Sequence, residues 1–172
     1  MTDPVPQKPA HIREFTPRSV AVGLLVAVVV GASYPYVVLK FGIGPNIGVV
    51  SAFFGFLALG LFSKSYNRWE NNLVQTAGTS SGQLAFVCFL LAAFDILSAE
   101  PGSGFSVHLT HFQTWTWLSL AGILGVFLAV PLRKHFIDEE NLPFPDGMAA
   151  AETMKMLDSK GVEARQSTMA ML

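Results

Sequence analysis

Two long stretches of the chain contain almost no charged residues. Residues 19–63 and 71–132 hold three charges between them, Lys40, Asp95 and Glu100, although the whole chain has 11 Lys and Arg and 12 Asp and Glu. A soluble domain distributes charge over all of its surface elements, whereas a protein that crosses the membrane several times alternates long apolar segments with short charged ones. Together with a hydrophobic content of 51%, the pattern excludes a disordered chain and predicts an all-α, polytopic membrane helical bundle.

Four segments are candidates for membrane crossings. A helix rises about 1.5 Å per residue and the hydrocarbon core is about 30 Å thick, so a helical span needs about 20 residues. Residues 19–39, 45–62 and 115–132 reach or approach that length. The second of them has small residues at positions 48, 52 and 55, and a further one, Gly44, lies just before it. These form one stripe on which a neighbouring helix can approach closely.

The third of the four crossings, residues 70–97, is unusual because only its second half is apolar. Residues 84–97 cover about 21 Å as a helix, so part of the polar stretch before them must lie at membrane depth. Polar side chains are tolerated there when they face protein or a water-filled cavity. On a helical wheel the polar residues of this stretch fall in one sector, flanked by Gly78 and Gly82, namely Asn72, Gln75, Thr76, Thr79 and Gln83. The sequence therefore predicts a polar-faced or broken third helix.

This polar stripe has two interpretations. In the structural one, amide and hydroxyl side chains bond across to neighbouring helices and touch no substrate. In the functional one, the stripe lines a solute pathway, because so many donors and acceptors on one face exceed what packing requires. We favour the pathway, and its candidate residues are Glu70, Asn71, Asn72, Gln75, Thr76, Thr79 and Gln83. Glu70, at the mouth of the stripe, has an ordinary alternative as a surface ion pair with Arg68.

Basic residues predict the orientation in the membrane. With a cytoplasmic N-terminus and four crossings, ten of the eleven Lys and Arg lie inside and Lys40 alone lies outside, as the positive-inside rule requires. We therefore expect a multi-pass protein of the cell membrane with both ends of this segment cytoplasmic. A cleaved signal peptide is the alternative for the first span, but the apolar run continues past the cleavage-like residues 30–32.

The chain divides into a membrane region and two polar ends. Residues 1–18, with four prolines, form a cytoplasmic N-terminal tail, and residues 19–132 form the four-helix transmembrane region. Residues 133–172 form a cytoplasmic segment, in which we expect Asp146 to be an N-cap and residues 148–157 to be a helix.

Other residues with chemical potential are isolated from one another. Asp95 is the one acid inside an apolar run but lies near its outer end, where it reaches water. His108 and His111 have a spacing that suits a metal, but no third ligand is near, and the single Cys88 cannot form a disulfide within the chain. Motifs for nucleophilic catalysis, phosphate binding or nucleic-acid binding are lacking. We therefore expect no enzyme, no cofactor, no resident metal and no nucleic-acid partner.

Two longer motifs carry a family resemblance. Residues 70–78 read ENNLVQTAG, and Pro131-Leu132-Arg133 is followed at residues 142–152 by LPFPDGMAAAE. In both motifs the chain resembles the N-terminal part of the oligopeptide transporter (OPT) superfamily, which includes peptide transporters and the yellow-stripe-like carriers of metal chelates. The resemblance covers residues 13–160, and the compact loops favour a prokaryotic member.

The resemblance implies a secondary active transporter that takes up small peptides or metal-chelate complexes, with H⁺ as the expected coupling ion. It also implies a fragment of a larger transporter, because family members carry a dozen or more membrane helices. The expected partners are then the lipid bilayer, the remaining helices and the substrate. Glu70 becomes the candidate coupling carboxylate, and the LPFPDG motif supplies a gate or cavity at the cytoplasmic side, with Pro143, Phe144, Pro145 and Gly147 as its residues.

Two other classes would explain the same pattern without further helices. A homo-oligomeric pore built from four-helix subunits accounts for the polar stripe and the glycine faces. A non-transporting assembly subunit accounts for the packing faces alone. The length of the native reading frame separates both of them from a carrier.

Overall fold

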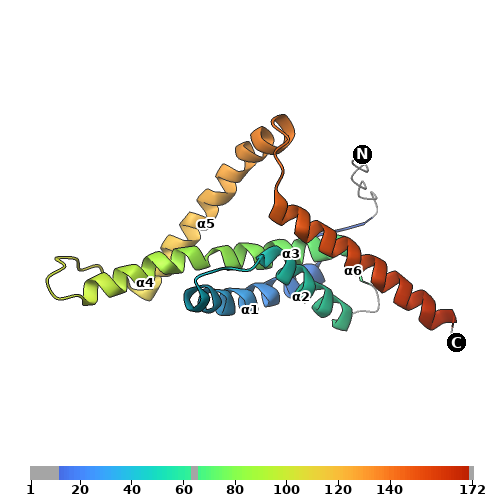
Figure 1. Ribbon diagram of the computed structural model, residues 1–172, viewed down its shortest axis with the longest axis horizontal. Helices are drawn as coiled ribbons and strands as arrows, with labels where there is room; N and C mark the ends of the chain where they lie inside the picture. The colour runs from blue at the N-terminus through green and yellow to red at the C-terminus, as the bar shows by residue number, and fades with distance from the viewer. Residues whose placement is uncertain (1–11, 63–65, 171–172) are drawn as a thin grey trace.

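The computed structural model describes residues 12–62 and 66–170, and all regular structure within these ranges is helical. The elements are α1 (Pro17–Phe41), α2 (Ile47–Phe62), α3 (Arg68–Gln83), α4 (Ala85–Ala99), α5 (His111–Arg133), a π-helical turn η1 (Lys134–Glu139) and α6 (Pro145–Ala170). Figure 1 shows α1 lying along α3 and the beginning of α4, with the rest of α4 extending beyond it and with α2 and α6 beside α3. The prediction of a helical membrane bundle is confirmed at this level.

Helix α1 begins and ends where local chemistry favours it. The hydroxyl of Thr16 accepts a hydrogen bond from the backbone N–H of Ser19 at 3.1 Å, and the hydroxyl of Ser19 accepts one from the N–H of Thr16 at 3.0 Å. Pro17 occupies the first turn, where its missing N–H costs nothing. At the other end Gly42 has a φ of 72°, the left-handed conformation that ends helices and that glycine adopts without strain.

Helices α3 and α4 form one nearly continuous helix, as the sequence predicts for the third crossing. Leu84 separates them, but its φ of −62° and ψ of −15° remain close to helical values. The combined helix, Arg68–Ala99, has 32 residues and is long and apolar enough to cross a membrane. Its first half is polar and its second half apolar.

The core lies mainly between α1 and α3. On α1, every fourth residue is buried, namely Val22, Val26, Val30, Tyr34 and Val38. On α3, the two glycines predicted to flank the polar stripe lie against this row. Gly78 lies against Val26 and, more closely, against Ser51 of α2. Gly82 lies against Val30 and, more closely, against Ile47 of α2, so a side chain at either glycine would displace its neighbours. Small residues thus allow the two backbones to approach, as is typical of membrane helices.

Helix α2 lies beside only one half of α1. Its first residue, Ile47, packs against Gly82 and Val30 and so lies level with the middle of α1. Near its other end, the guanidinium of Arg18 donates to the carbonyl oxygen of Leu59 at 2.7 Å. The 16 residues of α2 cover about 24 Å, which is less than a full span. The helices of spanning length are Pro17–Phe41, Arg68–Ala99 and His111–Glu139.

The chain runs back along α1 before α2 begins. The hydroxyl of Tyr34 donates to the carbonyl oxygen of Pro45 at 2.9 Å, and Gly44 lies so close to the same phenol that a side chain at Gly44 would overlap it. Figure 1 shows this extended connection from the end of α1 to the start of α2. The predicted second crossing, residues 45–62, is therefore an extended piece followed by a shorter helix.

The stripe of small residues on this segment faces its neighbours as predicted. Gly48 lies against Ala150 of α6 and Gln75 of α3, and Gly55 lies against Asn71 of α3. Ala52, between them, is fully buried. Gly44, the first of the four, precedes α2.

Helix α6 starts at the same level as α2 and runs in the same direction. Ala150 is 2% exposed in its contact with Gly48, and further along α6 the carboxylate of Asp158 lies 3.7 Å from the guanidinium of Arg68, the first residue of α3. The helix is longer than the predicted 148–157. It begins at Pro145, so the prediction of Asp146 as the N-cap is wrong, and Asp146 lies in the first turn.

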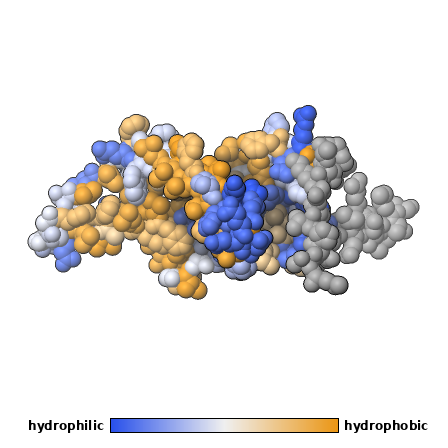
Figure 2. All heavy atoms as spheres, turned by 90° about the horizontal axis from the view of Figure 1, so that it is seen from above, coloured by the Kyte–Doolittle hydropathy of each residue, from blue (hydrophilic) through white to orange (hydrophobic). Residues whose placement is uncertain are grey.

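Helix α5 diverges from the other helices (Figure 1). Its main contacts are with η1, and none of its residues is buried. Large apolar side chains such as Phe127 and Val130 are about 70% exposed. Figure 2 shows apolar residues over much of the molecular face, with a hydrophilic patch where the top of α5 and η1 face the viewer. A helix that is apolar on all sides is covered by lipid or by other helices.

Candidate functional site

A polar cavity of about 290 Å³ lies where the starts of α2 and α6 meet the middle of the α3–α4 helix. Its wall comes from α1, the extended segment before α2, the first turn of α2, one face of α3, the first turn of α4 and the start of α6. The lining residues are Tyr34, Gly44, Pro45, Asn46, Ile47, Gly48, Gln75, Thr79, Gln83, Phe86, Asp146 and Gly147. Two motifs that lie about seventy residues apart in sequence therefore meet at one site.

Helix α3 contributes three residues of the predicted polar stripe to this wall. Gln75, Thr79 and Gln83 follow one another at four-residue intervals, so they lie on one helical face. The side-chain amide of Gln75 donates to the hydroxyl of Thr79 at 3.0 Å. This bond orients the Gln75 side chain along the wall, with its amide nitrogen towards Gly48 of α2 and its carbonyl oxygen 3.5 Å from the hydroxyl of Thr76.

Two other residues of the stripe do not reach the cavity. Asn72 and Thr76 are exposed, and the hydroxyl of Thr76 donates to the backbone carbonyl of Asn72 at 2.8 Å within the helix. The helical wheel grouped all five residues because they lie within one sector. The cavity occupies only the part of that sector that faces α2 and α6.

The start of α2 is fixed by Asn46, which sequence analysis did not select. The side-chain oxygen of Asn46 accepts from the backbone N–H of Val49 at 3.2 Å, the usual N-cap bond. Its side-chain nitrogen donates to the carboxylate of Asp146 at 3.2 Å and to the carbonyl oxygen of Asp146 at 3.3 Å. An asparagine before an apolar run is a recognisable N-cap signal, but nothing local in the sequence indicates its bond to Asp146.

The LPFPDG motif reaches the cavity through its last two residues. Asp146 and Gly147 line the wall and Pro143, Phe144 and Pro145 do not, and all five residues are exposed. Pro145 is the first residue of α6, and the backbone N–H of Met148 donates to the carbonyl oxygen of Phe144 at 2.9 Å to close the first turn. The prolines therefore direct the chain into the start of α6, and Asp146 supplies the polar side chain.

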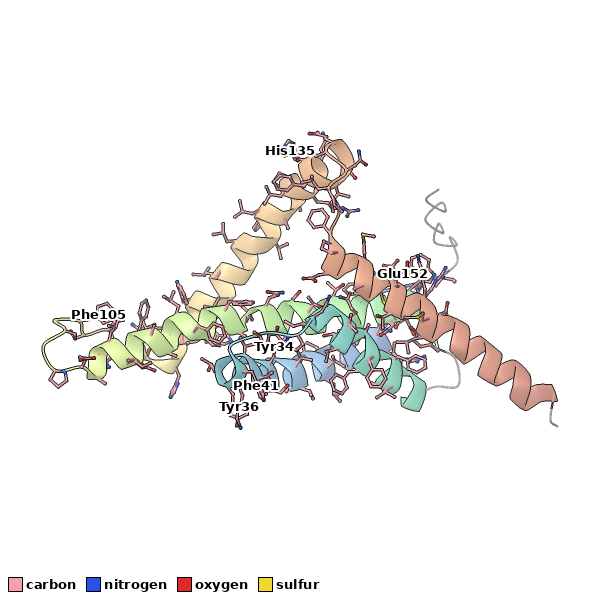
Figure 3. The ribbon with its side chains drawn as sticks, in the orientation of Figure 1. Tyr34, Tyr36, Phe41, Phe105, His135 and Glu152 are labelled. Carbon is pink, nitrogen blue, oxygen red and sulfur yellow. The ribbon has the colours of Figure 1, made fainter. Side chains whose placement is uncertain are left out.

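The charge distribution of the wall is simple. Asp146 is the one ionisable carboxylate among the lining residues, and none of them is Lys, Arg or His. The first turns of α2 and α6 both lie at the cavity, and helix N-termini carry a partial positive charge from their unpaired N–H groups. The remaining polar groups are amides and hydroxyls, which can donate or accept. Tyr34 points from α1 towards this region, whereas Tyr36 points away from it (Figure 3).

Glu70 belongs to a second polar cluster at the opposite end of α3. It is 6% exposed and accepts a hydrogen bond from the hydroxyl of Thr16 at 2.6 Å. Its other carboxylate oxygen lies 3.6 Å from the guanidinium of Arg18. The alternative interpretation, a surface pair with Arg68, is therefore wrong in both respects, because Glu70 is buried and its partner is Arg18. Arg68 instead pairs with Asp158 and lies over the ring of Trp69.

Asn71 is also buried away from the cavity. Its side-chain nitrogen donates to the carbonyl oxygen of Ala52 and to the hydroxyl of Tyr66, both at 3.0 Å. These bonds join α3 to α2, which favours helix packing over solute contact for this residue. Burial raises the pKa of Tyr66, so its phenol stays neutral at physiological pH and keeps its hydroxyl oxygen as an acceptor for Asn71.

The isolated ionisable residues do not converge on a second centre. Asp95, His108 and His111 are exposed. Within the described ranges no three His, Cys, Asp or Glu side chains lie close enough together to hold a metal ion.

Long apolar helices of spanning length are typical of a helical membrane protein. The chain belongs to the OPT oligopeptide transporter family, whose family model matches residues 14–172. This confirms the resemblance drawn from the two motifs. Members of this family are transporters and not enzymes.

Individual relatives carry names from both branches of the family. The chain is 33% identical over 120 residues to a putative oligopeptide transporter of Haemophilus influenzae, which covers 70% of this chain and 18% of that protein. It is 28% identical over 166 residues to a probable metal-nicotianamine transporter, YSL10, of Oryza sativa subsp. japonica. This match covers 83% of this chain and 24% of that protein. It is 25% identical over 170 residues to the metal-nicotianamine transporter YSL1 of Arabidopsis thaliana. This match covers 87% of this chain and 25% of that protein.

The chain thus spans about a quarter or less of the length of these relatives. The Haemophilus relative fits the expectation of a prokaryotic member. No solved structure matches the chain.

Proposed function

We propose that this chain forms part of the substrate site of a secondary active membrane carrier for small peptides or metal-chelate complexes. The observation that carries the proposal is the meeting of the two motifs at one cavity. Gln75, Thr79 and Gln83 come from the first motif and the residues after it, and Asp146 and Gly147 come from the second. A structural role alone would not require these polar groups to surround a cavity.

The backbone arrangement supports the same proposal. In many secondary carriers the substrate site lies near the bilayer midplane, where discontinuous helices begin and present their N-termini to the substrate. Helices α2 and α6 both begin at the level of Gly82, in the middle of the 32-residue helix formed by α3 and α4. Ligand pockets usually enclose about 300–1,000 Å³. The cavity of about 290 Å³ is at the lower limit of this range, so it is large enough for one end of a substrate.

The proposed topology has four crossings and a cytoplasmic N-terminus. The second crossing consists of residues 42–46, extended from the outer end of α1 to mid-depth, and then α2. Helix α6 starts at mid-depth beside α2 and runs to the cytoplasmic end, so in this proposal the segment 133–172, which the sequence predicts to be cytoplasmic, lies partly at membrane depth. Its Asp158 then lies at the same end as Arg18 and Arg68. The excess of basic residues at this end supports the orientation.

Further helices complete this carrier in our proposal. Helix α5 is apolar on all sides and has no buried residue, so lipid alone or additional helices must cover it. The relatives are at least about four times as long as the segment they share with this chain. Additional helices on the open side of the cavity would enclose the remainder of a substrate.

Proton coupling is part of the proposal, with Glu70 as the candidate coupling carboxylate. Glu70 lies apart from the cavity, so it would act through its ion pair with Arg18 and its hydrogen bond to Thr16. Protonation of Glu70 would remove the charge that holds Arg18, and the contact between α1 and α3 would loosen. Such a change can link proton binding to the movement of one helix against another.

Transport by the full-length protein in proteoliposomes tests the proposed function. Uptake of radiolabelled trialanine and of nickel–nicotianamine should identify the substrate class. Thr79→Val should weaken uptake several-fold, because it removes one hydroxyl from the wall without changing its volume, and a lost hydrogen bond costs about 1 kcal/mol. Thr76→Val makes the same change one turn away, outside the cavity, and serves as the control. Equal uptake by both variants and the wild type would contradict the assignment of the cavity as the substrate site.

A further inference from the structure

The cavity has one fixed charge, the carboxylate of Asp146. The other side chains of its wall are neutral, and none of the lining residues is a cation that could neutralise Asp146. The charged residues of α3 are Arg68 and Glu70, which lie at the far end of that helix and pair with Asp158 and Arg18. Helix α2 has no charged residue.

The carboxylate of Asp146 retains capacity for a ligand. Asn46 donates to one of its oxygens at 3.2 Å. An ionised carboxylate offers about four lone-pair sites to donors, so most of its accepting capacity is left for groups that enter the cavity. A carboxylate accepts hydrogen bonds but cannot donate them, and a second anion beside it would be repelled.

Two neighbouring side chains already make hydrogen bonds that hold the wall in place. The hydroxyl of Tyr34, the titratable group that faces this part of the cavity from α1, donates to Pro45. The amide of Gln75 donates to Thr79. The strongest interaction left for an incoming group is therefore a charge-assisted hydrogen bond to Asp146.

We propose that Asp146 binds a cationic group of the substrate, so that the cavity selects ligands with a positive charge at the end that enters it. The inference rests on the proposed function and specifies which part of the substrate the cavity recognises. Such a cation has two sources among the proposed substrates. It is the protonated amino terminus of a peptide or the metal-bearing end of a chelate.

Binding to the purified full-length protein distinguishes these sources. The probes are two pairs: trialanine with N-acetyl-trialanine, which lacks the ammonium group, and nickel–nicotianamine with metal-free nicotianamine, which lacks the metal ion but has protonated amines. We expect the wild type to bind the first member of one pair about tenfold to a hundredfold more tightly than the second, the usual range for one charge-assisted bond. The pair that shows the preference identifies the source.

Asp146→Asn tests the assignment, because it removes the charge and keeps an oxygen that can accept from Asn46. The variant should bind both members of that pair equally, and its unfolding temperature should stay near that of the wild type. Glu152→Gln is the matched control. It makes the same change on α6, at a side chain that bonds Lys155 and does not line the cavity (Figure 3). It should keep the full preference.

The outcomes separate the two proposals. If the wild type binds none of the four probes, the proposed function fails, and the inference fails with it. If the wild type binds a probe but lacks a preference within its pair, or if Asp146→Asn keeps the preference, the inference alone is overturned. A variant that loses stability but keeps the preference would show that Asp146 serves only the first turn of α6.

Discussion

The side chain of Asn46 donates a hydrogen bond to the carboxylate of Asp146 at 3.2 Å, across 100 residues of sequence. The same side chain caps α2 through its oxygen, which accepts from Val49. One residue therefore fixes both where α2 begins and how far its first turn lies from α6. Because both first turns border the cavity, this pair also sets the shape of the proposed site.

Exchanging the two side chains tests this relationship. Asn46→Asp keeps an oxygen for the cap but places a second carboxylate against Asp146. We expect the single variant to lose about 1 kcal/mol or more of unfolding free energy, from one lost hydrogen bond and like-charge repulsion. The double variant N46D/D146N restores one donor and one charged acceptor and should recover most of the loss. Thermal unfolding of the detergent-solubilised protein measures both. Additive losses in the double variant would contradict a direct interaction.

Gly55 tests the close packing of α2 on α3. A methyl group at this position would overlap the side-chain oxygen of Asn71 and press on Val74. We expect Gly55→Ala to cost about 1–3 kcal/mol, the usual range for overpacking. Gly60→Ala is the control. Gly60 lies five residues further along α2, and a methyl group there would have no atom within 4 Å. It should be neutral or slightly stabilising, because alanine favours helix more than glycine. Equal unfolding temperatures for both variants would show that the helices are further apart than described.

The proposed topology predicts which side of the membrane each loop reaches. In a protein with Cys88 replaced by alanine, a cysteine introduced at Ser103, between α4 and α5, should react with an impermeant maleimide added outside the cell. A cysteine introduced at Glu139, in η1, should react only when the reagent reaches the cytoplasm. Labelling at Ser103 from the cytoplasmic side alone would reverse the orientation inferred from the basic residues.

Local sequence patterns were sufficient to predict most of the helices. The change from polar to apolar residues at Leu84 predicted the interrupted third helix, and α3 and α4 meet there. The spacing of small residues at Gly48, Ala52 and Gly55 predicted a close-packing face, and this face of α2 packs against α3 and α6. Such features depend on neighbours within a few turns, so periodicity and capping chemistry reveal them.

The arrangement at the cavity could not be predicted in this way. The helical wheel placed Thr76 and Thr79 together, but which of them lines the cavity depends on where α2 begins. That start depends on the return of residues 42–46 along α1 and on the bond between Asn46 and Asp146. Contacts between distant segments leave no periodic signal in one sequence. The partner of Glu70 was misjudged for the same reason, because Arg68 is near in sequence whereas Arg18 is near in space.

Glu70→Gln separates a structural role of the ion pair from a role in coupling. The substitution keeps the size of the side chain and an oxygen for Thr16, but it removes the carboxylate charge that lies 3.6 Å from the guanidinium of Arg18. We expect a loss of about 1–3 kcal/mol in unfolding free energy, because hydrogen bonds to charged groups are worth about that much when partly buried. Asp158→Asn breaks the more exposed pair with Arg68, with both side chains 32% exposed, and should cost less than about 1 kcal/mol.

A second variant isolates coupling from stability. In E70Q/R18Q both charges of this pair are removed, so the part of the loss that comes from breaking the pair should return, whereas the bond from Arg18 to the carbonyl oxygen of Leu59 is lost as well. If Glu70 couples transport to protons, this double variant should exchange substrate across the membrane but fail to accumulate it, since exchange requires the site to alternate but no net proton movement. Proteoliposomes with an imposed pH gradient measure both activities in one preparation. Accumulation at the wild-type level with an unchanged pH dependence would remove Glu70 from the coupling mechanism and leave the pair with Arg18 as a contact that holds α1 against α3.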